Sequence, residues 1–239
     1  MPCAIVVGSS SGIGAALARL LSKHGYRVGL AARRGDLLEQ LRAELPNAAV
    51  AKVIDISQPE QAMPALRELA TEVGDVELYI VCSGVGFPNP ALDWSEERSM
   101  IEVNVLGFAA MVNAAVHLLE ARGSGHLVGI SSVAALRGGR VAPAYNASKA
   151  FVSNYLEGIR QWCFRKGLPI AVTDIQPGFV DTAMAAQSPQ LFWVASPEKA
   201  AEQIFAAIRA RKRHAYVTRR WRLVAWLLRG LPAAWYQRM

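Results

Sequence analysis

Tyr145 and Lys149 stand four residues apart at the start of a segment with a helical pattern. This spacing puts both side chains on one face of a helix, close enough for the ammonium to stabilise a phenolate. A free tyrosine has a pKa of about 10, so it needs such a neighbour to exchange protons near neutral pH. The pair is a candidate acid–base unit. A surface tyrosine beside a solvated lysine is the alternative.

A serine hydroxyl precedes this pair by thirteen residues. Ser132 follows an apolar segment, 126–131, that we predict to be a strand. Ligands bind at the carboxyl ends of parallel strands, so a hydroxyl at this place can donate a hydrogen bond to a carbonyl oxygen. The neighbouring Ser131 is the competing candidate.

A glycine-rich turn joins the first predicted strand to the first predicted helix, with the sequence Gly8-Ser9-Ser10-Ser11-Gly12-Ile13-Gly14. Gly8 can make the tight turn, Gly12 lets the backbone approach a pyrophosphate, and Gly14 allows the helix to pack on the strand. The helix N-terminus that follows attracts anionic oxygens. An ordinary strand-to-helix turn is the alternative.

Short apolar strands alternate with helical patterns along the chain. Because each parallel connection needs a crossover, this alternation predicts a doubly wound, Rossmann-like α/β fold, a parallel sheet with helices on both faces. We expect residues 1–239 to form a single domain and Asp36 to cap the second helix. The predicted strands are 3–7, 27–32, 50–54, 77–82, 126–131 and 169–175, and the predicted helices are 12–24, 36–45, 60–73, 96–122, 145–166 and 197–211.

The GxxxGxG spacing of the turn, with Ser132, Tyr145 and Lys149, resembles the short-chain dehydrogenase/reductase family over residues 3 to about 185. The Ser-to-Tyr interval favours Ser132 over Ser131. The resemblance implies hydride transfer between a nicotinamide and a carbonyl or secondary alcohol. Tyr145 would protonate the developing alkoxide, Ser132 would hold the carbonyl oxygen, and Lys149 would bind the ribose hydroxyls. Asn104 resembles a fourth catalytic position, which supports a relay water; an ordinary polar residue on a helix face is the alternative.

The same resemblance extends the cofactor site to the ends of other strands. Pro177-Gly178 and Thr182 resemble the segment that closes over nicotinamide, and Asp55 resembles the residue that meets the adenine amino group, although a turn-capping role is nearly as good an interpretation. The cofactor-binding residues implied are Gly8, Ser10, Ser11, Gly12, Ile13, Gly14, Arg33, Arg34, Asp55, Ile56, Ser83, Gly84, Tyr145, Lys149, Pro177, Gly178, Val180 and Thr182.

Two arginines, Arg33 and Arg34, end the second predicted strand. An NAD site generally has Asp or Glu here to accept the ribose 2′-hydroxyl, whereas a 2′-phosphate would be repelled by an acid and bound by arginine. We therefore expect NADP(H) to be favoured over NAD(H), with both arginines on the phosphate. Two merely solvated arginines are the alternative.

The composition and the absence of certain motifs exclude several classes of protein. The chain has 239 residues, of which 52% are hydrophobic and 19% charged, which excludes a disordered polar chain, a collagenous repeat and a coiled coil. The three cysteines form no CxxC pair, and HExxH and Walker lysine motifs are absent, so we expect no disulfide framework, no metal and neither of these hydrolase chemistries. Without a basic n-region or an apolar run of ~18 residues, neither secretion nor a membrane span is expected. A cytoplasmic location fits best.

Basic residues are concentrated near the end of the chain. Residues 209–239 hold nine Lys or Arg and no Asp or Glu, so the formal net charge of +7 comes from this part of the chain. We expect a basic amphipathic tail over about 214–239. It could lie on an anionic membrane surface, but packing over the substrate mouth or against a partner subunit is favoured. No recognised nucleic-acid reading module is present, so we expect no nucleic-acid partner. The helical face predicted in the tail consists of Trp221, Val224, Ala225 and Leu228.

A lid is expected over about 179–196, and apolar side chains near it favour a hydrophobic small-molecule substrate. By the family resemblance we expect a homodimer or homotetramer built on the two long helices. A non-catalytic NADP(H)-binding regulatory protein is the second function considered, and it is disfavoured because all four catalytic positions are filled. The apolar side chains near the expected lid, which favour a hydrophobic substrate, are those of Phe87, Phe179, Leu191, Phe192 and Trp193.

Overall fold

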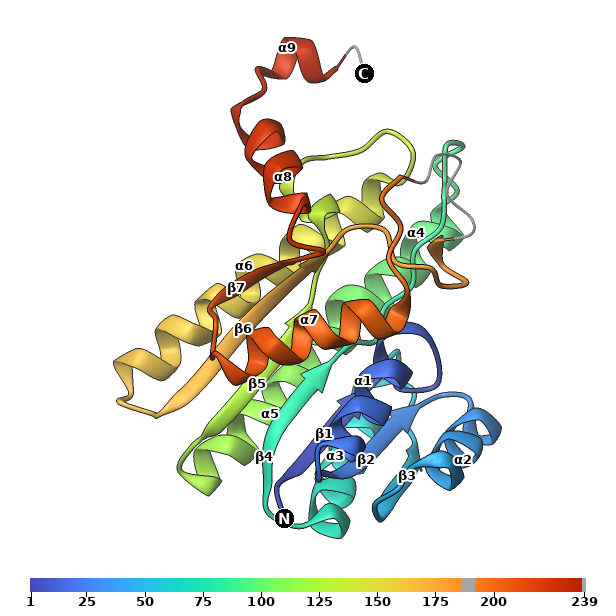
Figure 1. The fold of residues 1–239 in the computed structure, drawn as a ribbon. Helices are drawn as coiled ribbons and strands as arrows, with labels where there is room; N and C mark the ends of the chain where they lie inside the picture. Colours follow the sequence, from blue (N-terminus) through green and yellow to red (C-terminus); the bar gives the residue numbers. More distant parts are fainter. Residues whose placement is uncertain (186–191, 238–239) are drawn as a thin grey trace.

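A seven-stranded parallel sheet forms the centre of the computed structural model, which describes residues 1–185 and 192–237. Its strand order is β3-β2-β1-β4-β5-β6-β7, and every neighbouring pair is parallel (Figure 1). This arrangement confirms the predicted doubly wound α/β fold. The strands are β1 (Cys3–Val7), β2 (Arg27–Ala32), β3 (Ala49–Val53), β4 (Val76–Val81), β5 (Gly125–Ile130), β6 (Ile170–Pro177) and β7 (His214–Val217).

Helices cover both faces of the sheet because each strand sends alternate side chains to opposite sides. In β1, Ile5 and Val7 belong to the core beneath α3, α5 and α6, whereas Ala4 and Val6 belong to the core beneath α1, α2 and α7. The helices are α1 (Gly12–Lys23), α2 (Gly35–Glu44), α3 (Pro59–Val73), α4 (Trp94–Ile101), α5 (Phe108–Arg122), α6 (Pro143–Arg165), α7 (Pro197–Arg209), α8 (Trp221–Gly230) and α9 (Ala233–Tyr236), with a 3-10 turn, η2 (Val133–Leu136).

The long helix predicted at 96–122 is interrupted by a π-helical turn. α4 is followed by η1 (Glu102–Gly107), and α5 continues from there. Within the described residues this is the one helical run, Trp94–Arg122, long and apolar enough to cross a membrane, but more than half of its most apolar stretch is buried inside the fold. It is therefore a core helix. The π turn surrounds Asn104, and such turns occur often at functional sites.

Two sequence-based expectations are wrong. Asp36 does not cap α2: the helix begins at Gly35 after Arg34, and Asp36 lies in its first turn, where a carboxylate favours the positive end of the helix dipole. The tail expected from 214 begins instead with β7, which pairs with β6 and completes the sheet. This strand has only four residues of mixed polarity, so its apolar signal is weak.

Candidate active site

The predicted site residues gather at one edge of the sheet, where the parallel strands end. The strand order reverses between β1 and β4, and ligands of such folds bind in the crevice at this point. The glycine turn follows β1, the arginines follow β2, Asp55 and Ile56 follow β3, and Ser83 and Gly84 follow β4. Ser132 follows β5, and the segment from Pro177 ends β6. The order of the sheet thus brings distant segments of the chain to one crevice.

The glycine turn has the backbone that a close approach to a pyrophosphate requires. Gly8 and Gly12 have φ values of 92° and 55°, which favour glycine, and the Gly8 N–H donates to Ala31 O at 2.7 Å. A Cβ on Gly14 would collide with Gly8 O, so α1 packs directly on the turn. A Cβ on Gly12 would lie 2.9 Å from Thr182 Cγ2, so the segment after β6 reaches this turn.

Arg34 connects the end of β2 to the glycine turn. Its guanidinium donates to Ser10 Oγ at 2.8 Å and to Ser11 Oγ at 2.6 Å. Ser11 is the N-cap residue of α1, and the first turn of that helix holds no acid. A guanidinium and two hydroxyls therefore gather at the N-terminus of α1, an arrangement that suits phosphate. Arg33 is exposed beside it.

Asp55 has the turn-capping geometry considered as an alternative. Its Oδ1 accepts from Ser57 N at 3.0 Å and from Ser57 Oγ at 2.8 Å. The contact with adenine stays a prediction. Ile56 is buried, and its carbonyl lies against Gly107, where a Cβ would collide with it. The π turn thus packs on the strand end beside the expected adenine site.

The two competing serines have different surroundings. Ser131 is buried and donates to the Asp174 carboxylate, inside the sheet. Ser132 caps η2: its Oγ accepts from Ala134 N at 3.1 Å and donates to Pro177 O at 3.4 Å. The bonds of Ser131 point into the core, so Ser132 is the better placed of the two to meet a ligand at the sheet edge.

Lys149 is 5% exposed and extends along α6 toward the sheet edge. Its Nζ donates to Ile130 O at 3.1 Å and lies 5.8 Å from the centroid of the Tyr145 ring. Burial lowers the pKa of this ammonium to about 8, against opposing effects of Cys82 and Asp174. The fold thus keeps a cation available beside the phenol at neutral pH.

Tyr145 is half-buried near the start of α6. Burial raises the pKa of its phenol, and a hydrogen bond with the Ser132 hydroxyl opposes that rise. The phenol therefore carries its proton at neutral pH, which is the form that a general acid needs. Ser132, Tyr145 and Lys149 form one constellation, as the sequence predicts.

Asn104 holds the loop after β4 in place. Its Oδ1 accepts from Val85 N at 2.9 Å, and its Nδ2 donates to Val85 O at 2.7 Å and to Ser148 Oγ at 3.0 Å. A Cβ on Gly84 would lie 3.1 Å from Lys149 Nζ and 3.3 Å from Asn104 Oδ1. The amide and the ammonium thus face the same point of the backbone. The water-relay role of Asn104 stays a prediction.

Gly86 is a site residue that sequence reasoning missed. A Cβ there would lie 2.5 Å from Tyr145 Cδ2 and 2.6 Å from Tyr145 Cε2, so the loop backbone packs directly on the aromatic ring. The available signal was the second glycine after β4, two residues beyond Gly84, since an isolated glycine in a loop often marks a close approach of backbone to another group.

Trp221 was also missed as a site residue, although its helical face was predicted. The indole is 3% exposed and lies against Gly178, where a Cβ would overlap it. Its ring centroid lies 5.5 Å from that of Phe179, 5.0 Å from Phe192 and 6.0 Å from Trp193. An aromatic cluster thus packs on the end of β6, at the segment that is expected to close over nicotinamide. Leu191 and residues 186–190 of the expected lid lie outside the described part.

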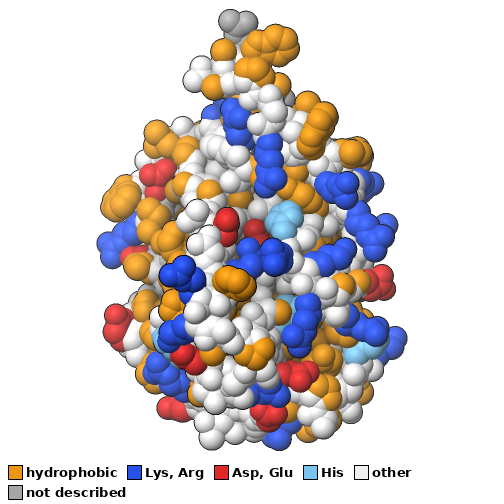
Figure 2. Space-filling model, turned by 90° about the vertical axis from the view of Figure 1, so that its left-hand side faces the viewer, with side chains coloured by type: hydrophobic (Ala, Val, Ile, Leu, Met, Phe, Trp, Pro, Cys, Tyr) orange, Lys and Arg blue, Asp and Glu red, His pale blue; other side chains and the backbone are white. Residues whose placement is uncertain are grey.

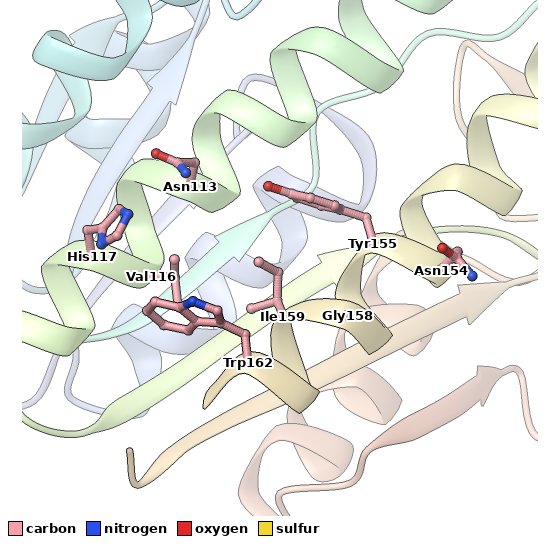
Figure 3. A pocket seen from close by; sticks show the side chains of 8 residues that line it. All are labelled: Asn113, Val116, His117, Asn154, Tyr155, Gly158, Ile159 and Trp162. Carbon is pink, nitrogen blue, oxygen red and sulfur yellow. The ribbon is translucent and has the colours of Figure 1, made fainter. Parts of the chain in front are cut away.

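A shallow groove of about 370 Å³ lies away from this crevice, between α5 and α6 (Figure 3). Val116 of α5 faces Ile159 and Trp162 of α6 across it, so its walls are partly apolar. None of the predicted catalytic or cofactor residues lines it. Within the described residues, no group of His, Cys, Asp and Glu could hold a metal ion.

Known proteins are similar to this chain in sequence. The family model for the short chain dehydrogenase matches residues 2–191. An uncharacterized oxidoreductase of Myxococcus xanthus is 38% identical over 188 residues, which are 77% of this chain and 74% of that protein. An uncharacterized oxidoreductase of Mycobacterium tuberculosis is 33% identical over 213 residues, 85% of this chain and 83% of that protein.

Solved structures show the same fold. A short chain dehydrogenase/reductase from Burkholderia phymatum in complex with NAD has a TM-score of 0.83 at 21% identity, over 94% of this chain and 91% of that one. An alcohol dehydrogenase from Thermococcus sibiricus, complexed with 5-hydroxy-NADP, has a TM-score of 0.78 at 23% identity, over 90% and 95%. The matched family model, the relatives and the crevice together show that this chain belongs to the short-chain dehydrogenase/reductase family and is an NAD(P)-dependent oxidoreductase.

Proposed function

We propose that this protein is an NADP(H)-dependent oxidoreductase that interconverts a hydrophobic ketone and its secondary alcohol. The observation that carries the proposal is that Ser132, Tyr145 and Lys149 gather at the end of β5, where Lys149 Nζ donates to Ile130 O and lies 5.8 Å from the centroid of the Tyr145 ring. A non-catalytic binder would need the turn but not these three groups.

The residues of the crevice fit a nicotinamide dinucleotide. The glycine turn would hold the pyrophosphate, Lys149 the ribose hydroxyls, and the segment Pro177–Thr182 the nicotinamide end. When bound, the nicotinamide supplies or accepts the hydride. Gly8 and Gly12 let the turn take its compact form, because both adopt positive φ values that favour glycine.

The side chains supply the proton and the orientation. The Ser132 hydroxyl donates a hydrogen bond to the substrate oxygen and fixes its position. Tyr145, which carries its proton at neutral pH, transfers it from the phenol oxygen to that same oxygen. Lys149 lowers the energy of the phenolate that remains. Asn104 keeps the loop after β4 against this group through its two bonds to Val85.

The preference for NADP(H) is supported by the surroundings of Arg34. Its guanidinium bridges the end of β2 and the two serine hydroxyls of the turn, and no acid ends β2. The position suits a 2′-phosphate. A hydrogen bond to a charged group contributes about 1.5 to 3 kcal/mol, so its loss weakens binding roughly tenfold or more.

A cofactor and substrate survey tests the proposal. Ketones of increasing apolar size are supplied to the full chain with NADPH or NADH, and nicotinamide absorbance is followed. Arg34→Ala should raise the KM for NADPH about tenfold or more and leave the KM for NADH within about twofold. Arg42→Ala, an exposed arginine of α2 paired with Glu39, is the matched control. If Arg34→Ala raised the KM for NADPH and for NADH equally, the role of Arg34 would be contradicted. If the unaltered chain reduced no carbonyl compound, the proposed function would be contradicted.

A hydrophobic substrate is supported by the aromatic cluster beside Gly178. Phe179, Phe192, Trp193 and Trp221 pack with edge or tilted geometry, which offers apolar surface and few hydrogen-bond partners. In the survey, kcat/KM should rise with the apolar area of the ketone.

The groove between α5 and α6 supports pairing of this face with a second copy of the chain (Figure 3). Trp162 lies in it under the ammonium of Lys166, 4.2 Å from the ring centroid. Light scattering should give a mass of two or four chains, and a monomer mass would contradict the pairing. We also propose a cytoplasmic location, since the three cysteines are unpaired.

A further inference from the structure

The C-terminal helix α8 is apolar on two opposite sides. Trp221 and Ala225 are buried against the body of the protein. On the other side Leu223 is 69%, Trp226 80% and Leu227 60% exposed. The i, i+3 and i, i+4 spacings place these three side chains together on the surface. A helix whose outer side carries a tryptophan and two leucines is unusual for a surface that meets only water.

Arginines flank this outer face. Arg222 and Arg229 are exposed and lie one turn before and after Trp226. Arg219 and Arg220 precede the helix, and the chain holds no Asp or Glu from residue 209 onward. Figure 2 shows hydrophobic side chains and Lys or Arg side chains gathered on the projection at one end of the molecule. The surface therefore joins exposed apolar area with positive charge that nothing nearby in the sequence neutralises.

The helix is fixed to the segment that follows Ser132. Arg137 Nη1 donates to Leu231 O at 3.0 Å and to Leu228 O at 3.4 Å. The Tyr236 hydroxyl donates to Gly138 O at 2.6 Å, and the Arg137 guanidinium lies 4.7 Å from the Tyr236 ring centroid. These contacts fix α8 against the segment after Ser132, so its outer face has a defined orientation on the same helix as Trp221.

We propose that this outer face of α8 docks on an anionic lipid surface. Tryptophan and leucine side chains can enter the boundary between headgroups and acyl chains, and flanking arginines pair with anionic headgroups. A second copy of the chain fits less well, because a symmetric contact would place one arginine-rich tail against another. Lipid phosphates supply the negative charge that this face lacks.

Docking there would hold the mouth of the crevice against the membrane. Trp221 packs on the end of β6 from the inner side of the same helix, so an apolar ketone dissolved in the bilayer would enter beside it. This last consequence depends on the proposed function, whereas the docking itself does not.

Sedimentation with vesicles tests the docking. The full chain is mixed with vesicles of phosphatidylcholine and phosphatidylglycerol, or of phosphatidylcholine alone. It should pellet with the anionic vesicles, and added salt should release it. Arg222→Gln with Arg229→Gln should weaken the partition about thirtyfold, since each basic residue near an anionic surface contributes about 1 kcal/mol. Leu223→Ser with Trp226→Ser should weaken it about tenfold or more.

Matched controls use the far end of α6 and the back of α3. Phe164 is 82% exposed, and Phe164→Ser removes an equally exposed aromatic ring. Arg67→Gln with Arg165→Gln removes the same charge from exposed positions elsewhere. These variants should bind vesicles as the unaltered chain does. Equal losses in the control and α8 variants, no pelleting with anionic vesicles, or dimers that Trp226→Ser converts to monomers would each overturn the proposal.

A soluble ketone separates this proposal from the proposed function. Without vesicles, the α8 surface variants should reduce it at the rate of the unaltered chain. A chain that reduces ketones but ignores vesicles contradicts only the docking. A chain that pellets with anionic vesicles but reduces no carbonyl compound contradicts only the proposed function.

Discussion

Replacing Gly86 by alanine tests the fit between the loop after β4 and the tyrosine ring. The added Cβ would lie 2.5 Å from Tyr145 Cδ2, whereas ordinary contact begins at 3.4 Å, so the ring must retreat by about 0.9 Å. Gly86 has no positive φ, so alanine fits its backbone and the whole effect acts through the contact. A displacement of about 1 Å at a reacting group costs on the order of a hundredfold in rate. We therefore expect kcat to fall about a hundredfold.

The assay is steady-state reduction of the best ketone, with dinucleotide binding measured separately by fluorescence titration. Gly86→Ala should leave the Kd of the dinucleotide within about threefold, because the proton donor moves and the glycine turn does not. Gly138→Ala is the control: it lies between Ser132 and Tyr145 in the sequence, is exposed, and a Cβ there meets nothing within 4 Å. A folded Gly86→Ala with a kcat like that of the control would refute the placement of Tyr145.

Three further predictions follow from buried polar groups. Burial lowers the pKa of Lys149 to about 8, so the unfolded chain binds more protons than the folded chain between about pH 8 and 10.5. The free energy of unfolding should therefore rise by about 3 kcal/mol over this range. In urea unfolding, Lys149→Met should not show this rise. Burial likewise lowers the pKa of His126 to about 4, so the free energy of unfolding should fall by about 3 kcal/mol as the pH drops from 6.5 to 4. In His126→Gln, the free energy of unfolding should change less over this range. Asn104→Ala leaves the two backbone groups of Val85 without their partner and should reduce both kcat and the free energy of unfolding, the latter by about 2 kcal/mol in chemical denaturation. Unchanged pH profiles or an equally stable Asn104→Ala would contradict these assignments.

The central sheet and most site residues could be predicted from the sequence. Apolar strands alternating with helices imply parallel pairing, and parallel strands end at one edge, so residues such as Gly12 and Ser132 are expected at the same edge of the sheet. The helical spacing of Tyr145 and Lys149 is local, and α6 places both at the crevice. Local sequence patterns therefore predict both the fold class and the positions of these residues.

The features that could not be predicted from the sequence depend on contacts between distant segments. The π turn at Asn104 has the same apolar pattern as an α-helix, and its packing of Gly107 on Ile56 is what distinguishes it. The contact of Trp221 with Gly178 joins the tail to the end of β6, which no local spacing indicates. β7 belongs to the sheet because β6 offers a free edge, and its own four residues carry a weak signal.

Removing one oxygen atom tests the central claim most directly. Tyr145→Phe keeps the ring that packs on Gly86 and deletes only the phenolic hydroxyl. Single-turnover mixing of this variant with dinucleotide and ketone should show dinucleotide binding like that of the unaltered chain and a hydride-transfer rate lower by a factor on the order of a thousand or more. A rate within about tenfold of that of the unaltered chain would contradict the account, because the proton would then come from another group.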